Sequence, residues 1–188
     1  MMCSRSNLLR LMHDWDLVGR LHVAPAADVA AHLRGGLFAV AKDAKRQRQI
    51  LNPRGWNSVS FTINDAAKDI GSAAALCGLY LPPGHVLVMA SDDLEDFFHT
   101  FSVTPAQALR NAIRGTFRGE DFVGCSAFKE SLRGQPVVSC LNTLAMGGTL
   151  APELAQHAHR TLLERAGCYP ARHRVTYVRR PAAAWAQL

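Results

Sequence analysis

Five consecutive apolar residues, at positions 86–90, lead into an acidic segment. The run reads Val-Leu-Val-Met-Ala, and Asp92, Asp93 and Asp96 follow within the next six residues. An unbroken apolar run of this kind is typical of a strand that is buried on both faces. We therefore expect a central strand that delivers carboxylates to its carboxyl end, which is a common way to hold a divalent metal.

Composition indicates a globular chain. Its 188 residues are 48% hydrophobic and 19% charged, enough for one domain with a core or slightly more. The formal net charge is +6, and arginine is commoner than lysine. This balance is compatible with a polyanionic partner, because guanidinium groups bind phosphate in a fork, but it does not require one.

Cysteine and hydropathy patterns favour an intracellular, soluble protein. The five cysteines are scattered without a C-x-x-C pair, as expected for buried thiols in a reducing compartment. No apolar run reaches the roughly twenty residues of a membrane span, and no secretory signal is visible, so we expect no membrane partner. His157 and His159 lie two apart, so on a helix they would not share a metal.

Periodicity and turn residues predict a mixed α+β fold. We expect helices at 6–21, 25–33, 62–77, 104–115 and 150–165, and strands at 37–40, 50–51, 86–90, 137–141 and 175–178. Residues 116–134 are polar and are expected to be irregular. We divide the chain into an N-terminal helical segment, residues 1–35, and a second region, residues 36–188.

Three segments carry charged, aromatic or glycine residues in unusual combinations. Residues 37–57 contain an apolar strand, the basic turn Lys-Asp-Ala-Lys-Arg-Gln-Arg and a second strand, which predicts a hairpin with a positive tip. Residues 93–103 read Asp-Leu-Glu-Asp-Phe-Phe-His-Thr-Phe-Ser-Val. Residues 144–156 begin Leu-Ala-Met-Gly-Gly and lead into a helix. Each segment by itself also fits an ordinary solvated turn.

Taken together and in this order, the three segments resemble motifs of reverse transcriptases, the RNA-directed DNA polymerases of retroelements. The first resembles the fingers hairpin, the second the palm motif D-L-x-D-A-F-x-x-I-P-L, and the third the L-P-Q-G loop. The resemblance covers about residues 37–156 and is to divergent retroelements rather than to a retroviral enzyme. It implies a partial right-hand polymerase fold, with a fingers hairpin and an incomplete palm sheet packed by helices.

The resemblance implies substrate-binding roles for five residues. Lys42 and Arg48 would contact the incoming triphosphate, because cations on a hairpin offset the charge of a polyanion. Phe98 would exclude a ribose 2′-hydroxyl and so favour deoxynucleotides. Gly147 would let the backbone approach nucleotide and template. Met146 stands where the family commonly has glutamine, so that contact would be altered.

The resemblance also implies a magnesium site. Asp93 would be the catalytic residue and a metal ligand, with the carbonyl of Leu94 as a further ligand. In the family, two magnesium ions with hard oxygen ligands clamp the attacking 3′-oxygen and the leaving pyrophosphate. The partners would be an RNA or DNA template–primer and a deoxynucleoside triphosphate.

The second palm motif of these polymerases, a pair of adjacent aspartates, has no counterpart. The last aspartate in the sequence is Asp121, and residues 174–181 offer arginines where carboxylates are needed. We therefore expect a fingers and partial-palm fragment, truncated before that motif and inactive as an isolated chain. The alternatives are a non-catalytic nucleic-acid-binding remnant, a fragment that folds poorly, and another metal-dependent phosphoryl-transfer enzyme that uses Asp93 and Asp96.

Overall fold

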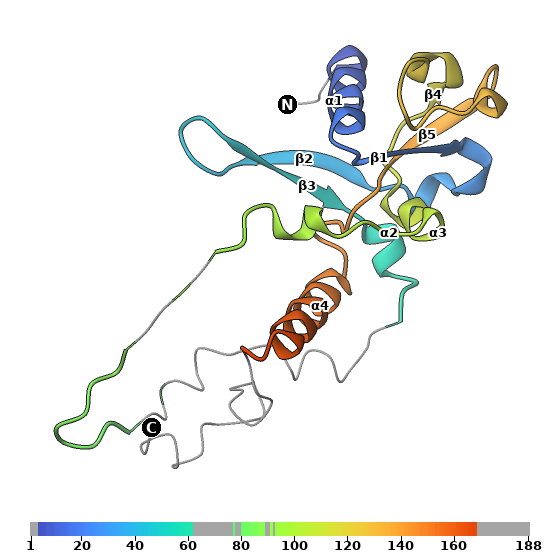
Figure 1. The fold of residues 1–188 in the computed structure, drawn as a ribbon. Coiled ribbons are helices and arrows are strands. Elements are labelled where there is room, and N and C mark those ends of the chain that lie inside the picture. Colours follow the sequence, from blue (N-terminus) through green and yellow to red (C-terminus); the bar gives the residue numbers. More distant parts are fainter. Residues whose placement is uncertain (1–3, 62–76, 78–79, 89–90, 92, 169–188) are drawn as a thin grey trace. The chain divides into compact units, whose positions relative to one another are not determined.

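A computed structural model describes residues 4–61, 77, 80–88, 91 and 93–168 (Figure 1). The chain divides into two compact units, which are described separately. The first comprises Met1–Ser60 and Asp96–Ala151, and the second comprises Phe61–Glu95 and Pro152–Leu188. Helices and small antiparallel sheets occur together, which confirms the predicted α+β class.

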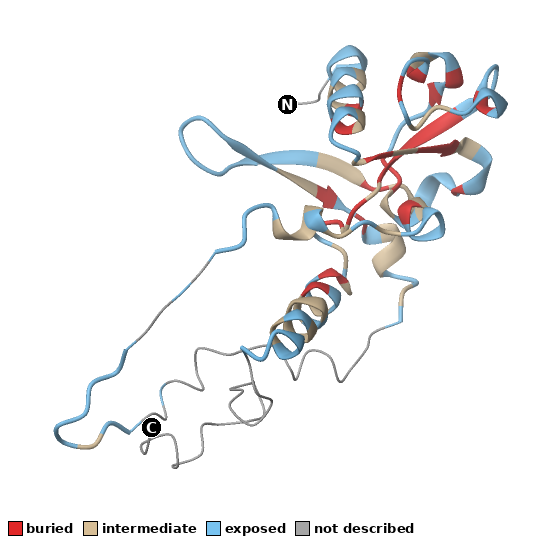
Figure 2. Ribbon diagram, in the orientation of Figure 1, coloured by how far each residue is buried: buried red, intermediate tan, exposed pale blue. Residues whose placement is uncertain are grey.

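The first unit is built on a three-stranded antiparallel sheet. Strand β5 (Pro136–Leu141) lies at its centre, between β1 (Leu21–Pro25) and β4 (Phe117–Arg118). The β5 strand was predicted from its apolar run, and its residues after the first proline are buried (Figure 2). The β1 strand was not predicted: its first and last residues fall at the ends of two predicted helices, and residues 22–24 were assigned to no element.

Helix α1 (Arg5–Leu17) contributes the buried side chains of Met12 and Trp15 to the core of this unit. The hydroxyl of Ser4 accepts a hydrogen bond from a first-turn amide and caps the helix. Gly19, with φ +69°, follows the last turn, where glycine is favoured because it has no Cβ. The expected end of this helix at residue 21 was too late, since that residue already pairs in β1.

Residues 117–134 pack against α1 although their sequence is mostly polar. The buried side chains of Phe117, Phe122 and Leu132 join the same core as α1. Asp16 on α1 accepts hydrogen bonds from the backbone amides of Ser126 (2.6 Å) and Ala127 (3.0 Å). Burial alone would raise the pKa of Asp16, but these bonds outweigh it and lower the pKa. The prediction that this segment is irregular therefore missed its ordered packing.

Strands β2 (Gly36–Ala41) and β3 (Gln47–Asn52) form the predicted hairpin. In Figure 1 they extend as a separate two-stranded ribbon. Helix α2 (Arg54–Asn57) follows β3 directly. The hairpin confirms the predicted order of strand, basic turn and strand, and β2 is one residue longer than predicted at each end. The β3 strand has six residues where two were predicted, so Gln47 and Arg48 belong to the strand and not to the turn.

The helix predicted at 104–115 is much shorter than expected. Helix α3 (Pro105–Ala108) begins where predicted, with the Thr104 hydroxyl as its cap. The helix does not continue to residue 115, because the amide of Ile113 donates a hydrogen bond to the carbonyl of Ser139 on β5. Short 3-10 turns complete the unit: η1 (Ala26–Asp28), η2 (Ala31–Leu33), η5 (Phe97–Thr100), η6 (Leu109–Asn111), η7 (Gly119–Phe122) and η8 (Glu130–Leu132). The predicted helix at 25–33 is represented by η1 and η2.

Helix α4 (Ala151–Arg165) lies almost wholly in the second unit and confirms the helix predicted at 150–165. Gly167, with φ +72°, follows it. The helix predicted at 62–77 falls outside the described residues except for its last position, and the strand predicted at 175–178 lies wholly outside them. Within the described part of the chain, no helix is long and apolar enough to cross a bilayer.

The central strand predicted at 86–90 is wrong for its described part. Val86, Leu87 and Val88 form no strand and are 82%, 56% and 86% exposed. A strand with two apolar faces is stable only where neighbouring strands and covering layers bury it. Among the described residues, no strand pairs with this segment. The last two residues of the run lie outside the described part.

Candidate nucleic-acid interface

The β2–β3 hairpin presents two chemically different faces, because successive side chains of a strand point to opposite sides. Leu37 and Leu51 are paired across the hairpin and pack with the core. On the other face, Phe38 is 48% exposed and Val40 is 42% exposed. Arg48 lies opposite Val40 on this outer face. An exposed aromatic, an aliphatic side chain and a guanidinium thus share one side of the ribbon.

Asp43 organises the tip of the hairpin. Its carboxylate accepts hydrogen bonds from the amides of Lys45 and Arg46, both at 2.9 Å, and from the guanidinium of Arg46 at 2.7 Å. These hydrogen bonds, with the nearby charge of Lys42, lower the pKa of Asp43. The side chains of Lys42 and Arg48 are exposed, and among the described residues neither forms an ion pair.

The glycine turn packs directly on the base of the hairpin. Gly147 has φ +107°, and a Cβ at this position would overlap the carbonyl oxygen of Leu51. The side-chain amide of Asn57 donates to the Gly147 carbonyl at 3.0 Å and accepts from the Thr149 amide at 3.2 Å. Met146, next to the glycine, is half-buried. The first and third motif segments are therefore joined through Asn57.

The segment that follows Asp96 is joined to the strand end that leads into the glycine turn. The amide of Val103 donates to the carbonyl of Asn142, and the amide of Leu144 donates to the carbonyl of Phe101. His99 also forms a 3.0 Å side-chain hydrogen bond with a buried threonine, which adds to this backbone pairing. Burial, with the positive charge of a nearby arginine, lowers the pKa of His99.

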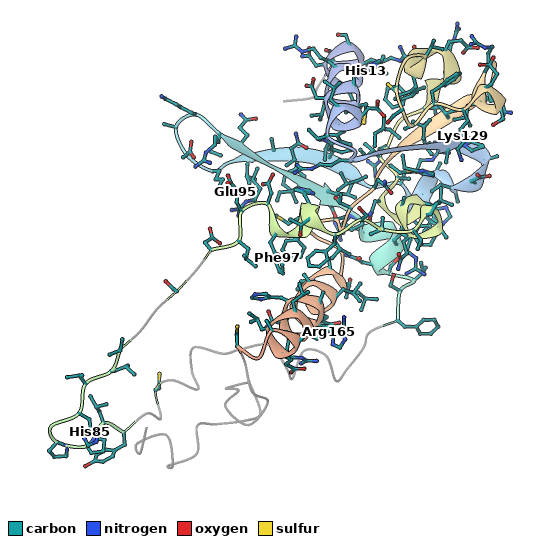
Figure 3. All side chains as sticks on the ribbon, viewed as in Figure 1. His13, His85, Glu95, Phe97, Lys129 and Arg165 are labelled. Atoms are coloured by element: carbon teal, nitrogen blue, oxygen red, sulfur yellow. The ribbon has the colours of Figure 1, made fainter. Side chains whose placement is uncertain are left out.

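Asp96 and Phe98 occupy a tight turn at the start of this segment. Asp96 adopts a left-handed conformation, φ +49°, and its carboxylate pairs with Arg20 at 3.1 Å. Phe98 is half-buried and meets Phe97 edge to face, with ring centroids 6.1 Å apart. Phe97, which is labelled in Figure 3, also meets Phe101 edge to face, with ring centroids 5.1 Å apart. The second motif segment thus has an aromatic cluster with a cation on its flank.

The metal ligands implied by the resemblance are not part of this unit. Asp93 and Leu94 are exposed residues of irregular backbone in the second unit. Asp92 lies outside the described residues. No group of three histidine, cysteine or acidic side chains in the described part of the chain is arranged to hold a metal. One carboxylate and one carbonyl do not make the two-ion centre that the resemblance implies.

Two contacts in this region could not be predicted from the sequence. Asn57 is the final residue of the first motif segment, and the sequence assigns it no role. Arg20 lies in the N-terminal segment, outside every motif, and only the tertiary structure places it beside Asp96.

Comparison with known proteins does not identify a family. No protein-family model matches the sequence. A search of curated proteins finds no match either. The reverse-transcriptase resemblance therefore remains a prediction that rests on the three motif segments.

Proposed function

We propose that the chain is the fingers and partial-palm region of a reverse-transcriptase-like protein, and that it binds nucleic acid. The observation that carries the proposal is the contact among those parts of the three motif segments that lie in the first unit. Asn57 bonds the glycine turn, and residues 101–103 pair with residues 142–144. These segments were selected from the sequence by resemblance alone, so their adjacency is independent support.

The outer face of the hairpin supplies the binding chemistry. Arg48 and Lys42 offer positive charge to phosphates, and a guanidinium binds a phosphate through two donors. Phe38 offers an exposed ring on the same face, on which a base can stack. Strand residues two apart lie about 7 Å apart along the ribbon, so one extended nucleotide strand can contact the ring and the cation together.

Nucleotide selection is the more specific part of the proposal. Phe98 would stand against the sugar of an incoming deoxynucleotide, with Met146 and Gly147 beside the base. All three residues lie in the unit that holds the hairpin.

We expect binding without polymerisation. Asp93 alone leaves a metal centre short of carboxylates, since no aspartate follows Asp121 in the sequence. In a primer-extension assay with magnesium and deoxynucleotides, the wild-type chain and Asp93→Ala are both expected to extend no primer. Extension by the wild type that is lost in Asp93→Ala would contradict this expectation.

Binding is tested by fluorescence anisotropy with a labelled primed template. Arg48→Ala is expected to weaken binding about tenfold, as expected for loss of a charge-assisted contact. It should also reduce the slope of log affinity against log salt by about 1, because one phosphate contact is removed.

Arg133→Ala is the matched control for this experiment. Arg133 is an exposed arginine outside the hairpin that pairs with Glu130. Its removal lowers the net charge by the same amount, so a general charge effect would weaken binding equally in both variants. Equal losses, or no binding by the wild type, would reject the proposed interface.

A further inference from the structure

Helix α1 forms a hydrogen bond with the β2–β3 hairpin. The bond lies on the face of the hairpin opposite the one that carries Arg48. Trp15 is only 6% exposed, and its indole Nε1 donates a hydrogen bond to Gln49 Oε1 at 3.0 Å. Gln49 lies on β3 between Arg48 and the half-buried Ile50, with its side chain on the core-facing side. The contact therefore joins the N-terminal helix to the strand that carries Arg48.

This contact lies toward the free end of the hairpin. Leu37 and Leu51 anchor its base in the core. Residues 40–48 are all exposed, so Gln49 is the half-buried residue of β3 nearest the tip. The tip lies about four residues farther on, or about 13 Å along an extended strand. A change of about 10° in the direction of β3 at Gln49 would therefore move the tip by about 2 Å.

We infer that Trp15 is a positioning residue that holds the hairpin in its binding orientation through Gln49. The hydrogen bond is part-buried, so water compensates only in part for a lost donor. The apolar ring alone would still fill the core, but it would not fix the direction of β3. The N-terminal segment then has a role in binding although it carries none of the motif residues. The binding consequence rests on the proposed function, whereas the positioning of the hairpin does not.

Hydrogen exchange tests the positioning without any nucleic acid. Trp15→Phe removes the N–H donor and keeps an aromatic ring in the core. Exchange of the β2–β3 amides is expected to accelerate about threefold to tenfold, with the amides of β5 as an internal reference. Gln49→Leu should reproduce the effect, and Gln49→Glu, which keeps an acceptor, should stay close to the wild type.

Trp56→Phe is the matched control for the tryptophan substitution. The indole N–H of Trp56 is buried and has no hydrogen-bond partner among the described residues. The hairpin amides of this variant should therefore exchange as in the wild type. If Trp15→Phe changes hairpin exchange no more than Trp56→Phe does, Trp15 is not a positioning residue.

A double-mutant cycle then tests the consequence for binding. Trp15→Phe is expected to weaken template binding about threefold to tenfold in the wild-type background. It should have little further effect in Arg48→Ala, because both act on the same contact. Additive losses would overturn the inference that Trp15 acts through the hairpin cation. If the hairpin amides exchange faster in Trp15→Phe but the wild type does not bind the template, the proposed function is rejected and the positioning role of Trp15 is still supported.

Discussion

Replacing Gly147 with alanine tests the packing of the glycine turn on the hairpin. The residue adopts φ +107°, a conformation that costs a non-glycine residue about 1–2 kcal/mol. The new methyl group would also overlap the carbonyl oxygen of Leu51, which is backbone and cannot turn away like a long side chain. Relief of this overlap requires the turn to move off the hairpin and to weaken the hydrogen bond from Asn57. That bond is worth about 1 kcal/mol.

The expected loss of stability from Gly147→Ala is therefore about 3 kcal/mol. For a chain of this length, each kcal/mol lowers the midpoint of thermal unfolding by about 2–4 °C, so the midpoint should fall by about 6–12 °C. Circular dichroism in a thermal scan measures this change, and urea titration monitored by tryptophan fluorescence gives the free energy of unfolding.

Gly19→Ala isolates the steric part of the effect. Gly19 has φ +69°, and nothing lies within 4 Å of a Cβ built there. This variant should lose only the conformational term, about 1–2 kcal/mol. If Gly147→Ala is no more destabilising than Gly19→Ala, the glycine turn does not pack on the Leu51 carbonyl, and the contact between the first and third motif segments is wrong.

Two further predictions follow from shifted pKa values. The pKa of Asp16 is lowered because its carboxylate accepts hydrogen bonds from the amides of residues 126 and 127. These bonds stabilise the fold at pH values above the unfolded-state pKa of about 3.9. The stabilisation is lost as the pH falls through the native-state pKa. The difference in melting temperature between wild type and Asp16→Asn should therefore be constant from pH 5 to 7 and shrink below about pH 4; a difference that grows in acid would contradict this. Burial raises the pKa of Cys140 to about 12, so mass spectrometry should find it unalkylated by iodoacetamide at about pH 8 until denaturant is added, whereas the exposed Cys168 reacts in the native protein. Equal native labelling of both thiols would refute the burial of Cys140.

Elements whose pattern is local were predictable from the sequence. The hairpin follows from two apolar runs around a basic turn, and Asp43 completes that turn with bonds to residues two and three positions ahead. The Thr104 cap and the turn at Gly147 are similarly set by neighbouring residues. In each case the information needed lies within a few residues, where sequence patterns are informative.

Elements that depend on distant partners were missed. The β1 strand has too short a pattern to be recognised without β5, with which it pairs in full register. Phe117 and Phe122 are buried because α1 covers them, although polar residues surround them in the sequence. Conversely, the apolar run at 86–88 satisfied the pattern of a buried strand but is exposed. Hydrophobic patterning identifies candidates for burial, while tertiary pairing decides which of them are buried.

The first palm-like motif is divided at the boundary between Glu95 and Asp96. Its second half is built into the first unit, where Arg20 pairs with Asp96 and the 101–103 backbone pairs beside the glycine turn. Its first half, with Asp93, is exposed in the second unit. A binding surface requires only that cations and rings share a face, whereas two-ion catalysis requires several carboxylates held in one geometry. The proposed binding and the catalysis that the resemblance implies therefore have separate structural requirements. Substitution at Arg48 is expected to weaken the proposed template binding, while substitution at Asp93 leaves it unchanged.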